Sequence, residues 1–414
     1  MKKDETGSCR PLRVVILGHT GELGGGELAL VRLCAAIDRA QVLVRVILFS
    51  DGPLRERLEL EGVVVDVIPL DPRTLRVDRH SAGRLTVANL RRAVLLLPFG
   101  WALVRRLRTL RPDLVSTNTL KADLIGIPAA IAARRPLVWY VHDRIAEDYL
   151  PRSMVRLIRR CARTFPRLVL ANSRATAATL APCQAIVAYP GFTPDQAIPE
   201  RVNRPLSTSQ MVGLIGRISP TKGQLEFVRA AAMVLERYPS TRFRIVGAPM
   251  FDSEDYSVQV RAEAMLLGVN HAIDWIGFVD DPAVELDRLT VFVHASPVPE
   301  PFGQVIVEAM IRGVPVIATR GGGATEILEP DSQPVRLSGE STESTEQRLG
   351  LLVTPGDVDQ LADSICEVLA DYSAAQARAT SAWRSAHTRF SIATTAALIT
   401  SAWRDAAGPQ WSGG

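Results

Sequence analysis

The stretch VFVHASPVPEPFGQVIVEAM, residues 291–310, holds two apolar runs joined by a loop. Residues 291–294 have the length and composition of a buried strand, and the residues after Gly303 have those of an apolar helix. Two carboxylates, Glu300 and Glu308, are separated by seven residues around the start of that helix. The stretch therefore predicts a strand, a loop and a helix that carries acidic side chains near its first turn.

The expected helix start has a chemical consequence. A helix that begins near Gly303 presents free amides with partial positive charge beside Glu300, and such amides bind anions. Glu308 lies about five residues further on, roughly 8 Å along the helix axis. One carboxylate can then bind sugar hydroxyls and the other ribose hydroxyls, with a diphosphate between them. An ordinary helix start with two surface glutamates is the alternative interpretation.

Similar strand-and-helix units extend over the whole chain. Short apolar runs alternate with helical patterns, which is typical of parallel, doubly wound sheets. The predicted strands are residues 12–17, 42–49, 63–68, 113–116, 137–141 and 168–171 in the first half, and 211–215, 242–246, 274–276, 291–294, 314–318 and 351–353 in the second. The sequence predicts an α/β protein with more than one such sheet.

The length of 414 residues exceeds what one hydrophobic core usually serves, so two domains are expected. Residues 194–210 are rich in Pro, Asn, Ser and Thr and are interpreted as a linker. We place the first domain at residues 1–203 and the second at 204–391. A helical pattern from Ile392 to Trp403 is expected to pack back on the first domain, with the chain to residue 414. The polar segment 331–347 is expected to be an exposed loop.

Composition excludes several classes of protein. Hydrophobic residues make up 47% and charged residues 22%, as in globular proteins. Five scattered cysteines without a C-x-x-C pair argue against a disulfide framework and a zinc site. The longest apolar run, Ala93–Val104, has twelve residues, too few to span a membrane. No apolar segment follows the first residues, so we expect no signal peptide and a cytoplasmic protein.

The net charge of +4 hides an asymmetry. Residues 1–203 contain 31 Lys and Arg against 19 Asp and Glu, whereas residues 204–414 contain 17 against 25. The acidic second half and the scarcity of aromatics among the arginines argue against nucleic acid as a partner. The basic, apolar stretch Arg84–Arg111 suits contact with an anionic membrane. A helix whose arginines merely cover its outer face is an equal alternative.

A second motif, GRISPTKG at residues 216–223, follows a predicted strand. Arg217 can form two hydrogen bonds to phosphate oxygens, and Lys222 supplies a point charge. Together they can stabilise negative charge that develops on a departing nucleoside diphosphate. Two solvated cations on a loop are the alternative.

The first half has weaker signals. Gly24, Gly25 and Gly26 precede a predicted helix and allow a ligand to approach the backbone. His142 follows a predicted strand, where side chains face the ligand crevice of an open sheet. A flexible turn and a structural histidine are the respective alternatives. The remaining histidines have no metal-ligand spacing and are interpreted as structural: His19, His80, His271, His294 and His387.

These motifs together resemble retaining glycosyltransferases of family 4. Residues 300–308 resemble the E-x7-E motif of that family, and residues 216–223 resemble its G-R-x4-K-G segment. Residues 277–280 are similar to the segment that contacts the nucleotide base, and residues 321–326 to a glycine turn beside the diphosphate. The resemblance is close between Gly213 and Leu369, whereas in the first half only the glycine loop and His142 match.

The resemblance implies a GT-B fold of two Rossmann-like domains that face a cleft, with the donor held mainly by the second. It implies transfer of a hexosyl group from a nucleoside-diphosphate sugar to an acceptor hydroxyl, with retention and without a metal or other cofactor. The implied catalytic residues are His142, Arg217, Lys222 and Glu300. The implied donor-binding residues are Gly25, Gly26, Gly277, Phe278, Val279, Phe302, Gly303, Gln304, Val305 and Glu308. An epimerase or phosphorylase of the same fold, or a non-catalytic sugar-nucleotide-binding protein, remains an alternative.

Overall fold

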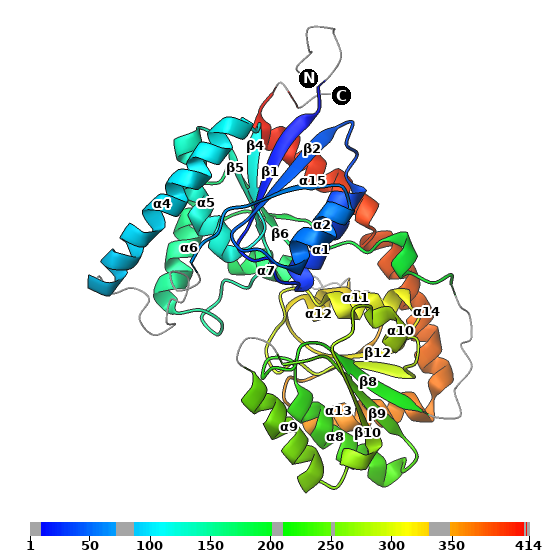
Figure 1. Cartoon of the computed structure of the whole chain (residues 1–414). Helices are drawn as coiled ribbons and strands as arrows, with labels where there is room; N and C mark the ends of the chain where they lie inside the picture. The colour runs from blue at the N-terminus through cyan, green and yellow to red at the C-terminus, as the bar shows by residue number, and fades with distance from the viewer. Residues whose placement is uncertain are drawn as a thin grey trace, which may run out of the picture. The chain divides into compact units, whose positions relative to one another are not determined.

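The computed structural model describes residues 10–71, 87–200, 210–249, 253–330, 348–409 and 411 (Figure 1). The chain divides into two compact units. The first unit comprises Met1–Gly191 and Ile392–Gly414, and the second comprises Phe192–Ser391. The first passage from one unit to the other therefore lies twelve residues before the expected boundary after residue 203.

The first unit contains a seven-stranded parallel sheet in the order β3-β2-β1-β4-β5-β6-β7. Residues that alternate along a strand enter two different cores, because a parallel sheet is covered on both faces. In β1, for example, Val14 and Ile16 belong to one core, and Val15 and Leu17 belong to the other. The strands are β1 (Leu12–Gly18), β2 (Val42–Leu48), β3 (Val64–Val67), β4 (Leu114–Thr117), β5 (Leu137–Val141), β6 (Leu168–Ala171) and β7 (Ile186–Val187).

Helices cover the two faces of this sheet separately (Figure 1). Side chains of α1 (Gly25–Ala36), α2 (Pro53–Leu60) and α15 (Ile392–Ala407) pack into one core. Those of α4 (Val87–Leu110), α5 (Leu120–Ala133) and α6 (Arg152–Thr164) pack into the other. The short α7 (Arg174–Thr179) follows β6. The C-terminal helix thus completes the first unit rather than the second.

The second unit contains a six-stranded parallel sheet in the order β10-β9-β8-β11-β12-β13. Its core is formed by alternate strand residues together with α8, α9 and α13. The strands are β8 (Met211–Ile215), β9 (Arg242–Val246), β10 (Ile273–Gly277), β11 (Val291–His294), β12 (Val316–Thr319) and β13 (Leu351–Val353). The helices are α8 (Gln224–Arg237), α9 (Glu254–Leu266), α10 (Pro282–Leu286), α11 (Gln304–Ile311), α12 (Gly322–Leu328), α13 (Val358–Ala370) and α14 (Tyr372–Arg389).

The strand order of this second sheet indicates the edge at which a ligand is expected to bind. The chain runs outward from β8 to β9 and β10, then returns to the other side of β8 with β11. The order therefore reverses between β8 and β11, and ligands of open α/β sheets bind outside the carboxyl ends of strands at such a point. The loops after these two strands carry the predicted donor-site motifs.

Of two expectations about connections, one needs correction and the other lies outside the described residues. The expected linker is wrong at its start, because the backbone amide of Ile198 donates to the carbonyl of Ile311 over 3.2 Å and Arg384 pairs with Glu200 within the second unit. Helix α4 continues through Pro98. The segment 331–347 lies outside the described residues. In the described part of the chain, no helix is long and apolar enough to cross a membrane.

Candidate donor site at the carboxyl edge of the second sheet

One predicted acidic residue and one predicted cationic residue of the second unit meet at this edge. Lys222, in the loop between β8 and α8, forms an ion pair through its Nζ atom with Oε1 of Glu300, in the loop after β11. The Glu300 side chain is only 12% exposed. Burial acts to raise the pKa of Glu300, but Lys222 and His294 outweigh it and hold the pKa well below its ordinary value. Glu300 is therefore a carboxylate at neutral pH.

Close backbone contacts hold Lys222 in reach of Glu300. Gly223 has φ +78°, and a Cβ atom there would stand 1.9 Å from the carbonyl oxygen of Ala295, at the end of β11. Ser296 Oγ donates to the carbonyl of Thr221 over 2.5 Å. Because only glycine permits both this φ and this contact, the loop after β8 lies directly against the end of β11.

The loop that carries Glu300 is held from its other side by a glycine turn. Glu300 forms a parallel bridge with Gly322, and the amide of Gly323 donates to the carbonyl of Glu300 over 2.9 Å. A Cβ atom on Gly322, which has φ +57°, would stand 1.9 Å from that same carbonyl oxygen. The turn Gly321–Gly323, predicted beside a diphosphate, therefore also fixes the backbone of Glu300.

Helix α11 begins where the sequence predicted it. Gly303 precedes the helix with φ +102°, and Gln304, Val305 and Glu308 are half-buried in its first turns. Glu308 engages in an interaction within the protein, as does the exposed Arg217. Their contacts with a donor stay predictions.

Phe302 plays a packing role that the sequence did not reveal. Its side chain is 2% exposed and meets Phe390 edge to face, with ring centroids 5.5 Å apart. The side chain anchors the loop between β11 and α11. Any contact of Phe302 with a donor must therefore come from its backbone.

The segment predicted to meet the nucleotide base follows β10. Gly277 has φ +82°, and its carbonyl accepts a hydrogen bond of 2.7 Å from the amide of Gly247, after β9. Phe278 is 63% exposed, and Val279 is half-buried. An exposed aromatic ring at a strand end offers a flat apolar surface on which a base can stack.

Polar residues also gather at the carboxyl edge of the first sheet. His142 follows β5, and its Nε2 lies 3.1 Å from Oδ1 of Asn118, which follows β4. Asn118 Nδ2 donates to the carbonyl of Gly26 over 3.4 Å, at the start of α1. This pairing turns Oδ1 toward the imidazole and assigns the histidine proton to Nε2. The glycine loop and His142, predicted separately, thus share one hydrogen-bond chain.

His142 is neutral at physiological pH. Burial lowers its pKa to about 4, and burial together with Lys121 lowers that of His19 to about 4. His142 can therefore orient or polarise a substrate by hydrogen bonding, but it offers no positive charge near pH 7.

Because the pKa values of these two histidines are lowered in the folded protein, we expect the protein to lose stability as the pH falls from 7 to 5. The unfolded chain takes up a proton near pH 6.5, whereas the folded protein resists protonation until about pH 4. Each histidine then lowers the free energy of unfolding by at most about 2 kcal/mol at pH 5. Urea unfolding at pH 7 and pH 5 should show that the free energy of unfolding falls less between these pH values in His142→Asn than in the wild type. His271→Asn, which removes an exposed histidine, is the control, and equal losses in all three proteins would contradict the burial argument.

Two family models match the chain in succession. The model of Glycosyltransferase Family 4 matches residues 23–195, and that of Glycosyl transferases group 1 matches residues 197–384. The chain belongs to glycosyltransferase family 4. The predicted membership of this family is confirmed.

Relatives of known name agree at the level of the family. A D-inositol 3-phosphate glycosyltransferase of Kribbella flavida is 27% identical over 285 residues, which cover 63% of each chain. One of Acidothermus cellulolyticus is 33% identical over 156 residues, which cover 35% of this chain and 34% of that protein. The matches thus span about a third to two thirds of these relatives.

Solved structures extend the likeness over nearly the whole chain. Anabaena Alr3699/HepE in complex with UDP-glucose is 26% identical with a TM-score of 0.77, covering 95% of this chain and 100% of that one. Sucrose-phosphate synthase of Thermosynechococcus elongatus, 19% identical with a TM-score of 0.72 over 95% of this chain and 98% of its own, shares the fold. The predicted GT-B fold class, with two Rossmann-like parallel-sheet domains, is confirmed.

Sequence reasoning missed two residues of this glycosyltransferase's candidate site. His294 was interpreted as structural, yet its Nε2 lies 3.7 Å from Oε1 of Glu300. Asn118 was not singled out at all. The available signal was position, because both residues stand at or directly after the end of a parallel strand, where ligand-binding side chains gather.

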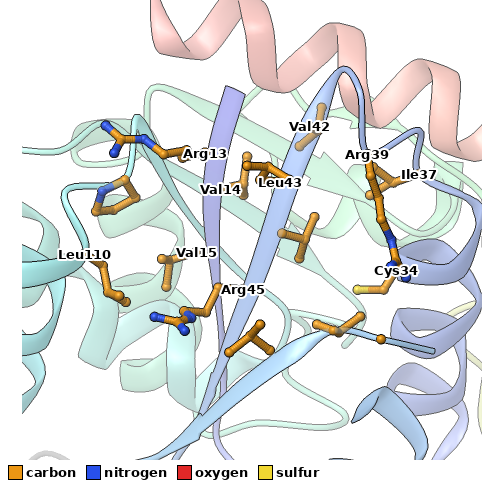
Figure 2. A pocket seen from close by; sticks show the side chains of 15 residues that line it. Arg13, Val14, Val15, Cys34, Ile37, Arg39, Val42, Leu43, Arg45 and Leu110 are labelled. Carbon is orange, nitrogen blue, oxygen red and sulfur yellow. The ribbon is translucent and has the colours of Figure 1, made fainter. Parts of the chain in front are cut away.

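A hollow of about 420 Å³ in the first unit is a different feature (Figure 2). It lies at the amino ends of β1 and β2, the edge opposite to His142. Its arginines have protein partners: Arg13 pairs with Asp113 over 3.6 Å, and Arg45 with Asp66 over 3.7 Å. We assign it no ligand. Among the described residues, no cluster of His, Cys, Asp or Glu is arranged to hold a metal ion.

Proposed function

We propose that this glycosyltransferase moves a hexosyl group from a nucleoside-diphosphate sugar to an acceptor hydroxyl, with retention at the anomeric carbon. The observation that carries the proposal is the meeting of Lys222 and Glu300 at the switch point of the second sheet. The retaining course is supported by the E-x7-E segment, since that motif is typical of retaining members of the family. UDP is the first nucleotide to test, because the similar HepE structures contain UDP and UDP-glucose.

The roles of the residues follow from their chemistry. Lys222 and Arg217 meet the diphosphate and stabilise the charge that develops on it as the glycosidic bond breaks. Glu300 and Glu308 accept hydrogen bonds from donor hydroxyls, and the amides at the start of α11 face the anion. We propose that these groups suffice without a metal ion. At the carboxyl edge of the first sheet, His142 orients or polarises the substrate by hydrogen bonding, and Gly25 and Gly26 allow the donor to approach the backbone.

The test is a transfer assay with labelled UDP-glucose and a panel of hydroxyl-bearing acceptors, run with and without EDTA. We expect UDP to raise the melting temperature, because it binds only the native state. We expect an α-linked product from the α-linked donor, with the same rate in EDTA. A β-linked product would contradict retention. Loss of activity in EDTA would contradict metal independence, and UDP binding with no transfer to any acceptor would favour a non-catalytic binding protein.

We further propose that the acceptor is presented at the inner face of an anionic membrane. The composition of α4 and α6, which cover the same face of the first sheet, supports this proposal, because the two helices contain ten arginines and no acidic residue. On α4, Leu97 and Trp101 are 66% and 65% exposed, and the Arg105 guanidinium lies 5.3 Å from the centre of the Trp101 ring. Exposed apolar side chains next to arginines fit the boundary between lipid tails and anionic headgroups.

Vesicle co-sedimentation tests this surface. We expect binding to vesicles that contain phosphatidylglycerol at low salt, and release at high salt as charges are screened. A double variant, Arg105→Ser with Arg108→Ser, should bind about 30-fold more weakly, at about 1 kcal/mol per arginine. The matched control, Arg237→Ser with Arg288→Ser, removes two exposed arginines from the second unit. Equal binding by both double variants would refute the proposed surface.

A further inference from the structure

His294 is a buried histidine whose ring nitrogens lack hydrogen-bond partners among the described residues. It is the last residue of β11 and is 6% exposed. Buried polar atoms are nearly always hydrogen-bonded, so an unpartnered imidazole indicates a partner that this state of the site does not supply.

The Glu300 carboxylate is an acceptor close to this imidazole. His294 Nε2 lies 3.7 Å from Oε1, too far for a hydrogen bond, and about 0.5 Å of approach would form one. Lys222 already occupies the same oxygen. Lysine and histidine therefore lie beside the same carboxylate oxygen, and in this state only the lysine bonds to it.

We propose that His294 is a positioning residue that takes over the Glu300 carboxylate when Lys222 turns to the diphosphate of a bound donor. The anion attracts the lysine ammonium, and Glu300 would then be a buried carboxylate without its cation, which is costly. The Nε2–H group of His294 supplies a hydrogen bond to the same oxygen. Glu300 thereby keeps a fixed orientation while its partner changes.

The identity of the anion rests on the proposed function, but the exchange of partners does not. Any change that removes the lysine charge should lead His294 to form a hydrogen bond with the Glu300 carboxylate. Lys222→Met removes that charge and keeps the apolar stem of the side chain, so it imitates the donor-bound arrangement without any nucleotide. This variant separates the two claims.

The experiment records imidazole nitrogen resonances of protein labelled with ¹⁵N-histidine. The chain has six histidines, and the His294 signals are assigned by their loss in His294→Gln. We expect the Nε2 resonance of His294 to shift in Lys222→Met, to keep its wild-type position in Lys222→Met with Glu300→Leu, and to shift in the wild type on addition of UDP. The His271 signals serve as the internal control. An Nε2 resonance that is the same in the wild type and in Lys222→Met would overturn the exchange.

Kinetic variants give an independent readout. Gln places its amide nitrogen near the position of Nε2, Asn places it near Nδ1, and Leu offers no donor. We expect kcat to fall about 10-fold to 100-fold in His294→Leu and His294→Asn, to be largely restored in His294→Gln, and KM for the donor to change little. Equal kcat values for the Asn and Gln variants would overturn the assignment to Nε2. If Lys222→Met shifts the resonance but no nucleotide binds, the proposed function fails and the exchange stands.

Discussion

Lys222→Ala should reduce glycosyl transfer by about 100-fold or more and weaken UDP binding, while the protein stays folded. The loss is expected because removal of one preorganised positive group from a site of developing negative charge costs roughly this much. The fold should persist because Glu300 has a second neighbour, His294. Steady-state kinetics with UDP-glucose, UDP titration calorimetry and a melting curve measure the three effects.

The control for this variant is Arg237→Ala. Arg237 lies in the same unit, and its ion pair with Asp363 is exposed on both sides. Arg237→Ala should leave transfer and UDP binding unchanged. Unchanged turnover in Lys222→Ala would contradict a role of the loop after β8 in binding the diphosphate.

Glu308→Ala should also abolish transfer without unfolding the protein, since Glu308 belongs to the same predicted donor site.

Gly322→Ala is the second change with a large expected effect. The new methyl group would stand 1.9 Å from the carbonyl oxygen of Glu300, so the backbone of Glu300 must move. Position 322 also has a φ of +57°, which is strained for alanine. We expect a loss of unfolding free energy of about 3 kcal/mol and a fall in transfer of about 100-fold.

Gly313 provides a matched control, because it has a similar φ of +64° but nothing within 4 Å of the added methyl group. Gly313→Ala should therefore cost only the backbone strain, about 1 kcal/mol, with transfer unaffected. Chemical denaturation and kinetics on both variants separate strain from displacement of Glu300. A Gly322→Ala protein as active as Gly313→Ala would show that the glycine turn does not position Glu300.

The sequence allowed much of this fold to be predicted, because strand-and-helix alternation and strand ends are local features. The strands β8 to β13, the start of α11 and the placement of the motifs after strands all follow from runs of a few residues. The domain boundary could not be predicted from such runs. Residues 194–200 look like a linker, but they are held by Ile311 and Arg384, which are distant in sequence.

The candidate site was predictable to a similar degree. Glu300, Lys222 and the glycine turns belong to recognisable segments, and their meeting follows from the sheet order. The position of His294 at a strand end was a signal that it lies near the site, but the sequence did not show that the Glu300 carboxylate lies beside it. The burial of Phe302 against Phe390 escaped prediction for the same reason, since those residues lie far apart in the chain.

A crystal structure of the wild-type protein with UDP tests the central claim most directly. The diphosphate should lie within hydrogen-bond distance of Lys222 Nζ and face the first amides of α11, with Glu300 parted from the lysine. A diphosphate bound elsewhere, with the Lys222–Glu300 ion pair intact, would contradict the account.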